Sequence, residues 1–123
     1  PYLNERFIGL DWDGRREATF RHHNTTKPIA TSACAKLEDA TIVTTDPALF
    51  TDPGERTAYD AVASTCKLAR YSTDCYGYGL LAAGHIDLVI ESGLSDYDYK
   101  ALMPIIRAAG GTVTDWAGND NIT

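Results

Sequence analysis

The chain has 123 residues, of which 44% are hydrophobic and 23% charged, and its formal net charge at pH 7 is −6. This size and balance predict a single globular domain over residues 1–123, with enough apolar side chains for one core. The acidic charge argues against a nucleic-acid partner, because no basic stripe is present to neutralise phosphates. No apolar run is long enough to cross a membrane.

The first half of the chain predicts a hairpin, a connection and a buried strand. Two segments rich in β-forming residues, 5–12 and 16–22, flank the dipeptide Asp13-Gly14, which is typical of a tight hairpin turn. The polar segment 24–40 is rich in turn-forming residues, and we interpret it as a connection. The β-branched segment 40–46 predicts a buried strand.

The second half alternates between helical and strand patterns. Apolar residues recur at helical spacing after Pro53-Gly54, and short β-rich runs separate the helical segments. These patterns predict helices over 53–67, 76–84 and 98–110, and strands over 68–72, 85–92 and 112–116. The alternation predicts a layered α/β fold, in which a mixed β-sheet packs against helices.

Pro104 lies inside the last of these predicted helices. A proline in a helix interior removes one backbone hydrogen bond and costs about 3 kcal/mol. The helix therefore either begins late, with Pro104 near its first turn, or is kinked at this residue.

The cysteines and histidines do not have the spacing of a zinc site. Three cysteines, Cys34, Cys66 and Cys75, without a paired motif indicate a reducing compartment, taken here as the cytoplasm, with the thiols acting as small hydrophobic side chains. The three histidines are expected at the surface or in turns. The chain begins at Pro1, which we interpret as a sign of processing or of a fragment.

Three acidic residues have both a structural and a functional interpretation. Asp98 begins the predicted helix 98–110, so it is either an N-terminal cap or an oxygen ligand of Mg²⁺. Glu91 ends an apolar strand and is either a solvated strand end or part of a ligand crevice. Asp74 precedes a helix and is either a cap or a crevice side chain.

The segment 91–118 resembles the C-terminal signature of the inositol monophosphatase superfamily. The resemblance rests on the aromatic-Asp pair Tyr97-Asp98, on the run 109–111 (Ala-Gly-Gly), and on the D-x-x-G run from Asp115 to Gly118. Segments 5–50, 70–91 and 98–116 are similar to the histidinol-phosphate phosphatase branch of that superfamily. The resemblance therefore covers nearly the whole chain.

This resemblance implies hydrolysis of a small phosphomonoester by a water molecule that Mg²⁺ ions activate. It implies that Asp98 is a metal ligand and that Glu91, Asp74 and Cys75 face the substrate. A carboxylate at position 74 further implies recognition of a cationic group, such as the amine or imidazole of histidinol phosphate. The superfamily also implies a homodimer.

Two metal-binding motifs of the superfamily are absent from the sequence. The motif D-P-[IL]-D-G-[ST] is represented only by the D-P pairs at 46–47 and 52–53, and the upstream E-E pair is not found. Two-metal chemistry needs carboxylates from both parts of such an enzyme. We therefore expect the C-terminal domain of a longer phosphatase, which is inactive without its N-terminal half.

Three functions remain open at this point. The first is a histidinol-phosphate phosphatase of histidine biosynthesis. The second is an inositol or sugar phosphate phosphatase of the same superfamily. The third, from a different class, is a non-catalytic module that binds a ligand or a partner.

Overall fold

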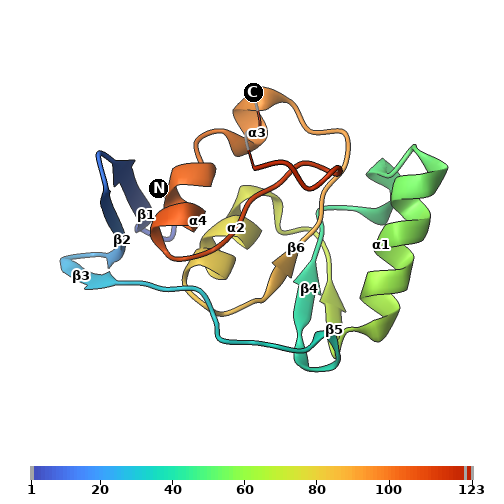
Figure 1. Ribbon diagram of the computed structural model, residues 1–123. Helices are drawn as coiled ribbons and strands as arrows, with labels where there is room; N and C mark the ends of the chain where they lie inside the picture. Colours follow the sequence, from blue (N-terminus) through green and yellow to red (C-terminus); the bar gives the residue numbers. More distant parts are fainter. Residues whose placement is uncertain (1, 121, 123) are drawn as a thin grey trace.

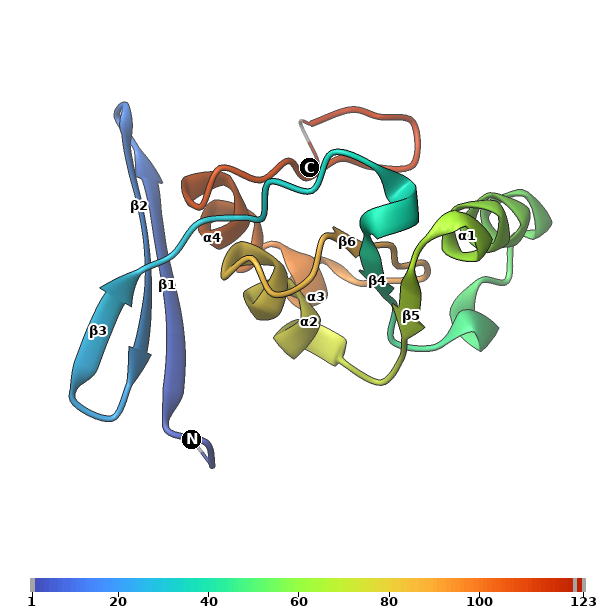
Figure 2. The same cartoon turned by 90° about the horizontal axis from the view of Figure 1, so that it is seen from below.

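The fold consists of four layers that alternate between sheet and helix. The computed structural model describes residues 2–120 and 122. An antiparallel sheet, the helices α2 (Asp74–Ala82) and α4 (Met103–Ala108), a parallel sheet and the helix α1 (Pro53–Thr65) follow one another from left to right in Figure 1, and Figure 2 shows the same order. The α/β class is confirmed. The described strands form two sheets, one antiparallel and one parallel, where the sequence predicts one mixed sheet.

The antiparallel sheet contains β1 (Glu5–Trp12), β2 (Arg15–His22) and β3 (Thr25–Pro28), in that order. The predicted hairpin is confirmed, since Asp13 and Gly14 have φ values of 49° and 75°, as a type I′ turn requires. The prediction of a connection is wrong for residues 25–28, which form β3. All four side chains of β3 are exposed, so no apolar alternation reveals this strand in the sequence.

The parallel sheet has the order β5-β4-β6, with β4 (Thr41–Val43) between β5 (Leu68–Arg70) and β6 (Leu88–Val89). Two short 3-10 helices, η1 (Leu37–Asp39) and η2 (Pro47–Leu49), flank β4. The central strand is buried, and the exposed fraction of Ile42 and Val43 is at most 2%. The strands predicted over 40–46, 68–72 and 85–92 are confirmed in position but are shorter, and β6 keeps only two paired residues.

Helix α1 covers one face of the parallel sheet and begins where the sequence predicts. Asp52 caps it by accepting a hydrogen bond from the N–H of Glu55 at 2.9 Å, and Pro53 occupies the first turn, where its missing N–H removes no helical bond. Tyr59 of this helix is buried against Ile42 and Phe50. These three side chains form the core between α1 and the sheet.

A close approach between β1 and α4 joins the antiparallel sheet to the helical layer. A Cβ atom at Gly9 would lie 2.3 Å from the Cα of Ile105, so only glycine fits at this point. Helix α2 packs beside α4 and begins at Asp74, slightly earlier than predicted. Gly84, with a φ of 77°, follows the end of α2 in the place where the sequence predicts a stop.

The predicted helix over 98–110 is divided into α3 (Asp96–Tyr99) and α4. Pro104 lies in the first turn of α4, so a late start is the correct alternative for this residue. The prediction of a strand over 112–116 is wrong, because residues 111–115 have no regular secondary structure. A strand needs a partner for its backbone groups, and no strand in the described part of the chain pairs with this segment.

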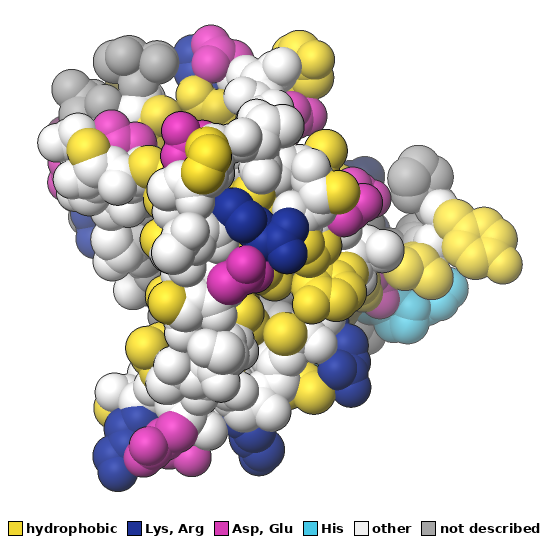
Figure 3. All heavy atoms as spheres, turned by 90° about the vertical axis from the view of Figure 1, so that its right-hand side faces the viewer, with side chains coloured by type: hydrophobic (Ala, Val, Ile, Leu, Met, Phe, Trp, Pro, Cys, Tyr) yellow, Lys and Arg dark blue, Asp and Glu magenta, His cyan; other side chains and the backbone are white. Residues whose placement is uncertain are grey.

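Side chains of different types are mixed on the face of the molecule that Figure 3 shows. On the face seen in Figure 3, Lys and Arg side chains are scattered among acidic and hydrophobic ones. His22, His23 and His85 are exposed, as predicted. Within residues 2–120 and 122, no helix has the length and apolar character needed to cross a bilayer.

The three cysteines are free thiols with different surroundings. Cys34 and Cys75 are exposed, whereas Cys66 is half-buried and packs against the core of α1. The prediction that the thiols act as small hydrophobic side chains is therefore confirmed for Cys66 and is wrong for the other two.

Candidate active site

Glu91 follows β6 and is held at the carboxyl ends of the parallel strands. Its Oε1 accepts hydrogen bonds from the N–H (2.9 Å) and the hydroxyl (2.7 Å) of Thr45, and its Oε2 accepts one from the hydroxyl of Thr44 (3.1 Å). Both threonines follow β4, so the carboxylate joins the ends of two neighbouring strands. Glu91 is half-buried and ordered by its partners, which favours the crevice position over a solvated strand end.

The loop after Glu91 is fixed from two directions. The hydroxyl of Ser92, a residue that is 7% exposed, donates a hydrogen bond to Glu55 of α1. The Nε1 of Trp116 donates to the carbonyl oxygen of Glu91 at 3.1 Å. Trp116 also packs edge-on against Phe50, with the ring centroids 6.1 Å apart. These contacts hold the segment 112–118 beside the end of β6 and close one side of a cavity.

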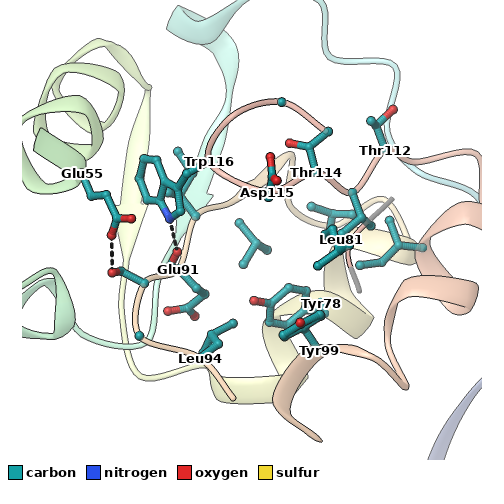
Figure 4. Close-up of a pocket in the computed structure, with 18 residues that line it drawn as sticks. Glu55, Tyr78, Leu81, Glu91, Leu94, Tyr99, Thr112, Thr114, Asp115 and Trp116 are labelled. Atoms are coloured by element: carbon teal, nitrogen blue, oxygen red, sulfur yellow. Dashed lines mark hydrogen bonds between the residues drawn. The ribbon is translucent and has the colours of Figure 1, made fainter. Parts of the chain in front are cut away.

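This cavity has a volume of about 590 Å³. Acidic and aromatic side chains contribute to its wall: Glu55, Glu91, Asp115, Tyr78, Tyr99 and Trp116. No Lys, Arg or His of the described residues lines it. Figure 4 shows Tyr78 and Tyr99 on one side of the cavity and Thr112 and Thr114 on the other. Because its charged groups are all acidic, the cavity favours a cationic or an uncharged group over an anion.

Asp98 caps the short helix α3. Its Oδ2 accepts a hydrogen bond from the N–H of Ser95 at 2.8 Å, and its own N–H donates to the carbonyl oxygen of Ser95 at 2.9 Å. The capping alternative is therefore confirmed. The Oδ1 of Asp98 has no hydrogen-bond partner among the described residues, and Asp98 is exposed, so this oxygen is open to a cation.

Both carboxylate oxygens of Asp96, the other acidic residue of α3, contact neighbouring side chains. Its Oδ2 lies 2.5 Å from the Nζ of Lys100, and its Oδ1 accepts a hydrogen bond from the hydroxyl of Tyr99 at 3.0 Å. The hydrogen bonds from Lys100 and Tyr99 lower the pKa of Asp96. Asp96 therefore has a local structural role and differs from Asp98, which keeps one free oxygen.

Asp74 and Cys75 form the first turn of α2 and are exposed. Asp74 and Ser72 have φ values of 44° and 61°, in the left-handed region that costs free energy for residues other than glycine. The helix begins without a side-chain cap, so the capping alternative for Asp74 is not supported. Neither Asp74 nor Cys75 lines the cavity beside Glu91.

Tyr78 is a site residue that the sequence analysis missed. It lines the cavity, and in Figure 4 its hydroxyl points toward Glu91. Burial raises the pKa of the Tyr78 hydroxyl, and the negative charges of Glu91 and Asp98 raise it further. Of the acids that the sequence singles out, Glu91 shares the cavity wall with Tyr78, and Asp98 does not line the cavity. No local signal in the sequence marks this tyrosine, because its place in the cavity wall depends on how α2 and the end of β6 meet in space.

The described residues do not form a complete metal site. Among residues 2–120 and 122, no group of three or more His, Cys, Asp or Glu side chains is arranged to hold a metal ion. The free oxygen of Asp98 fits the chemistry of Mg²⁺, which commonly takes one or two protein carboxylates and fills its other positions with water and phosphate oxygens. The chain thus offers one ligand of such a site.

The alternating layers, with a cavity that has acidic side chains in its wall at the carboxyl ends of parallel strands, define an α/β protein. Comparison with known proteins makes this class more specific. The sequence matches the inositol monophosphatase family over residues 1–123, and the chain belongs to that family.

Similar proteins are longer than this chain. The protein named bifunctional phosphatase IMPL2, chloroplastic, from Arabidopsis thaliana is 48% identical over 118 residues, which are 96% of this chain and 32% of that protein. A histidinol-phosphatase from Chlorobaculum parvum is 32% identical over 95 residues, which are 77% of this chain and 37% of that protein. A solved structure of an inositol monophosphatase from Zymomonas mobilis superposes with a TM-score of 0.72 and 34% identity, over 94% of this chain and 49% of that one. The chain therefore spans about a third to a half of the proteins that it matches.

Proposed function

We propose that this chain is the C-terminal domain of a Mg²⁺-dependent phosphomonoesterase, which cleaves a small phosphate monoester by attack of a water molecule. The observation that carries the proposal is membership of the inositol monophosphatase family over the whole chain. The site geometry supports it, because the predicted substrate residue Glu91 lines the cavity and the hydroxyl of Tyr78 points toward it.

Asp98 would hold the cation with the oxygen that makes no hydrogen bond among the described residues, while its Oδ2 accepts the hydrogen bond from the N–H of Ser95. Capping and metal binding are therefore compatible at this residue, since they use different oxygens. When bound, Mg²⁺ lowers the pKa of a coordinated water and stabilises charge on the departing ester oxygen. The remaining metal ligands come from a part of the enzyme outside these 123 residues, so the isolated chain is inactive.

Glu91 orients the part of the substrate that carries no phosphate. Thr44 and Thr45 hold its carboxylate, which reduces the entropy lost when a substrate binds. Among the described residues, its Oε2 accepts one hydrogen bond, from the hydroxyl of Thr44, and has room for a donor from the substrate. Asp74 and Cys75, exposed in the first turn of α2, complete the substrate-facing set that the family resemblance implies.

Histidinol phosphate is the substrate that we favour. Acidic and aromatic side chains line the cavity beside Glu91, and such a wall suits an amine or an imidazolium group. The relatives named histidinol-phosphatase, from Chlorobaculum parvum and Mycobacterium tuberculosis, support this choice. The chain would then act in histidine biosynthesis.

An inositol or sugar phosphate is the second candidate substrate. The Zymomonas structure, whose name is that of an inositol monophosphatase, is slightly more identical to this chain than the Chlorobaculum histidinol-phosphatase is. An uncharged polyol also suits a cavity whose described lining has no basic side chain.

The proposal also concerns the polypeptide partners of the chain and its cellular compartment. The chain works with the N-terminal half of its enzyme, and the family resemblance predicts a homodimer. The reducing compartment expected from the cysteines also stays a prediction, and the name of the Arabidopsis relative gives a chloroplast location for that protein.

The test is a comparison of two substrates and two proteins. Phosphate release from histidinol phosphate and from inositol monophosphate is measured with the full-length protein and with the isolated chain, at saturating Mg²⁺. We expect the full-length protein to prefer histidinol phosphate and the isolated chain to be inactive. Preference for inositol monophosphate would favour the second candidate, and ligand binding without turnover by the full-length protein would support the non-catalytic module.

A further inference from the structure

The D-x-x-G run from Asp115 to Gly118 folds into a turn that the side chain of its first residue closes. The Oδ1 of Asp115 accepts hydrogen bonds from the N–H of Ala117 at 2.9 Å and of Asn119 at 2.8 Å. Its Oδ2 accepts another from the side-chain amide of Asn119 at 2.9 Å. Gly118 has a φ of 84°, and its N–H donates to the carbonyl oxygen of Asp115 at 3.1 Å. The D-x-x-G turn is therefore held by both side-chain and main-chain hydrogen bonds.

The D-x-x-G turn carries Trp116 beside the residue that follows β6. The Nε1 of Trp116 donates to the carbonyl oxygen of Glu91 at 3.1 Å, a bond drawn in Figure 4, and its ring packs edge-on against Phe50. An indole N–H donates and cannot accept, so the bond and the ring contact together determine how the side chain is oriented. Trp116 thus links the D-x-x-G turn to the main chain of Glu91.

The main chain at Glu91 no longer has support from β4. The N–H of Ile90 donates to the carbonyl oxygen of Val43 at 3.2 Å, and in the described part of the chain no backbone hydrogen bond joins residues 91–95 to β4. The carbonyl oxygen of Glu91 accepts from the Trp116 indole. Trp116 therefore supports the main chain at the residue whose side chain we expect to meet the substrate.

A different element holds the next residue. The hydroxyl of Ser92, which is 7% exposed, donates to the Oε2 of Glu55 in the first turn of α1. The two threonines that follow β4 hold the carboxylate of Glu91 itself. The side chain and the main chain of Glu91 are thus fixed by separate contacts, and the main-chain contact is that of Trp116.

We propose that Trp116 is a positioning residue for Glu91, and that the D-x-x-G turn serves to place its indole. Through the bond to the carbonyl oxygen, Trp116 determines where the Glu91 carboxylate lies relative to the substrate. The inference rests on the proposed function, in which Glu91 orients the part of the substrate that carries no phosphate. A displacement of about 1 Å at such a group weakens its contact with the substrate even when the group itself is intact.

The kinetics of full-length Trp116→Phe test the proposal. The phenylalanine ring can still pack against Phe50, but the N–H is absent. For whichever of histidinol phosphate and inositol monophosphate the wild type prefers, KM should rise about tenfold and kcat should change less than about threefold, because the weakened contact is made equally in the ground state and the transition state. The inhibition constant of inorganic phosphate should stay unchanged, since phosphate lacks the part of the substrate that Glu91 orients.

The matched control is Trp12→Phe, the same substitution at a residue that is 76% exposed at the end of β1. It should leave KM, kcat and the inhibition constant unchanged. An unchanged KM in Trp116→Phe would overturn the proposal. An equal rise in KM and in the inhibition constant of phosphate would also overturn it, because a general distortion of the site affects both.

A double-mutant cycle with Glu91→Gln separates positioning from direct contact. If Trp116 acts through the Glu91 carboxylate, Trp116→Phe should raise KM by less than about twofold when Glu91→Gln is already present. A tenfold rise in that background would overturn the proposal and assign Trp116 to direct contact with the substrate.

Asp115→Ala gives a second variant, which keeps the indole and removes the three hydrogen bonds that the carboxylate accepts. It tests the proposal even where Trp116→Phe does not fold. KM should rise while the inhibition constant of phosphate is retained, and an unchanged KM would contradict the role of the D-x-x-G turn.

Failure of the proposed function has a different signature. A full-length wild type that turns over neither substrate would refute the proposed function. The Kd for histidinol phosphate, measured by calorimetry, then tests the inference and should rise about tenfold in Trp116→Phe. An equal Kd in wild type and variant, or no binding to the wild type, would overturn the inference as well.

Discussion

The carboxylate of Glu91 accepts two hydrogen bonds from Thr45 on a single oxygen, one from the main-chain N–H at 2.9 Å and one from the hydroxyl at 2.7 Å. This pair joins the residue that follows β6 to the end of β4. It gives Glu91 a structural role that exists without any substrate, in addition to the substrate role proposed for it. The two roles have different experimental consequences.

Glu91→Ala should lower the free energy of unfolding of the chain by about 1–3 kcal/mol, because the hydroxyl of Thr44, a residue that is 0% exposed, loses its acceptor. Glu91→Gln should cost less, since its amide oxygen still accepts from Thr45. Urea unfolding measures both values. Glu38→Ala on the exposed helix η1 is the control and should change the stability by less than about 0.5 kcal/mol. An equal effect at both positions would contradict the structural role.

Tyr59→Phe should leave the stability at neutral pH unchanged or raise it by up to about 1 kcal/mol. The Tyr59 hydroxyl is buried and makes no hydrogen bond of normal geometry among the described residues, although the phenol of Tyr71 is its neighbour, so its removal leaves no group unsatisfied. Tyr59→Ala, which empties the space between Ile42 and Phe50, should cost about 3–5 kcal/mol. A clear loss of stability in the phenylalanine variant would show that the hydroxyl has a partner in solution.

The same tyrosine predicts a loss of stability at alkaline pH. Burial and the neighbouring phenol of Tyr71 raise the pKa of Tyr59 to about 12 from the ordinary value of 10.0. A raised pKa contributes stability that is complete below pH 10 and is lost as the pH rises through 12, which amounts to about 1 kcal/mol at pH 11. Urea unfolding at pH 8 and pH 11 should therefore show a smaller difference in Tyr59→Phe than in the wild type. An identical difference in both proteins would exclude Tyr59 as the source.

Gly9→Ala should destabilise the chain by about 1–3 kcal/mol, the usual cost of an overpacked contact. The added Cβ would lie 2.3 Å from the Cα of Ile105, and this backbone atom cannot move aside as a side chain can. Ile8→Thr, on the opposite and solvent-facing side of β1, is the matched control and should change the stability by about 0.5 kcal/mol or less. Thermal unfolding followed by circular dichroism compares the two, and a stable Gly9→Ala protein would place β1 farther from α4.

Turn residues and helix caps predicted those parts of the fold that short-range interactions determine. The Asp13-Gly14 turn and the cap of α1 depend on interactions within a few residues of the chain, so they can be recognised in the sequence. β3 was missed because its side chains are exposed and its partner, β2, holds it through the backbone. The strand predicted over 112–116 was wrong, because a β-branched pattern alone does not supply the pairing partner that a strand needs, and the described residues provide none.

The candidate site was only partly accessible to sequence reasoning. Asp98 and Glu91 were identified through the family resemblance, and their spacing alone left capping and solvation open. The involvement of Thr44, Thr45 and Tyr78 depends on how β4, α2 and β6 meet in space, which no single segment of sequence reveals. Asp74 was expected near this site, and its exposed, left-handed position in the first turn of α2 became visible only in the structure.

The proposal that Asp98 is a metal ligand of a Mg²⁺-dependent phosphatase is tested most directly by the turnover of full-length Asp98→Asn. Turnover is measured at saturating Mg²⁺, with histidinol phosphate as the substrate. The asparagine oxygen can still accept the hydrogen bond from Ser95, so the cap and the stability should be retained. Loss of the charged ligand should reduce kcat by about a hundredfold or more, as expected when one preorganised electrostatic contact is removed.

The matched control is Asp96→Asn, which removes the exposed ion pair with Lys100 and should leave turnover unchanged. We predict that full-length Asp98→Asn is stable and nearly inactive, and that full-length Asp96→Asn is active. Near-normal turnover of Asp98→Asn would contradict its role as a metal ligand.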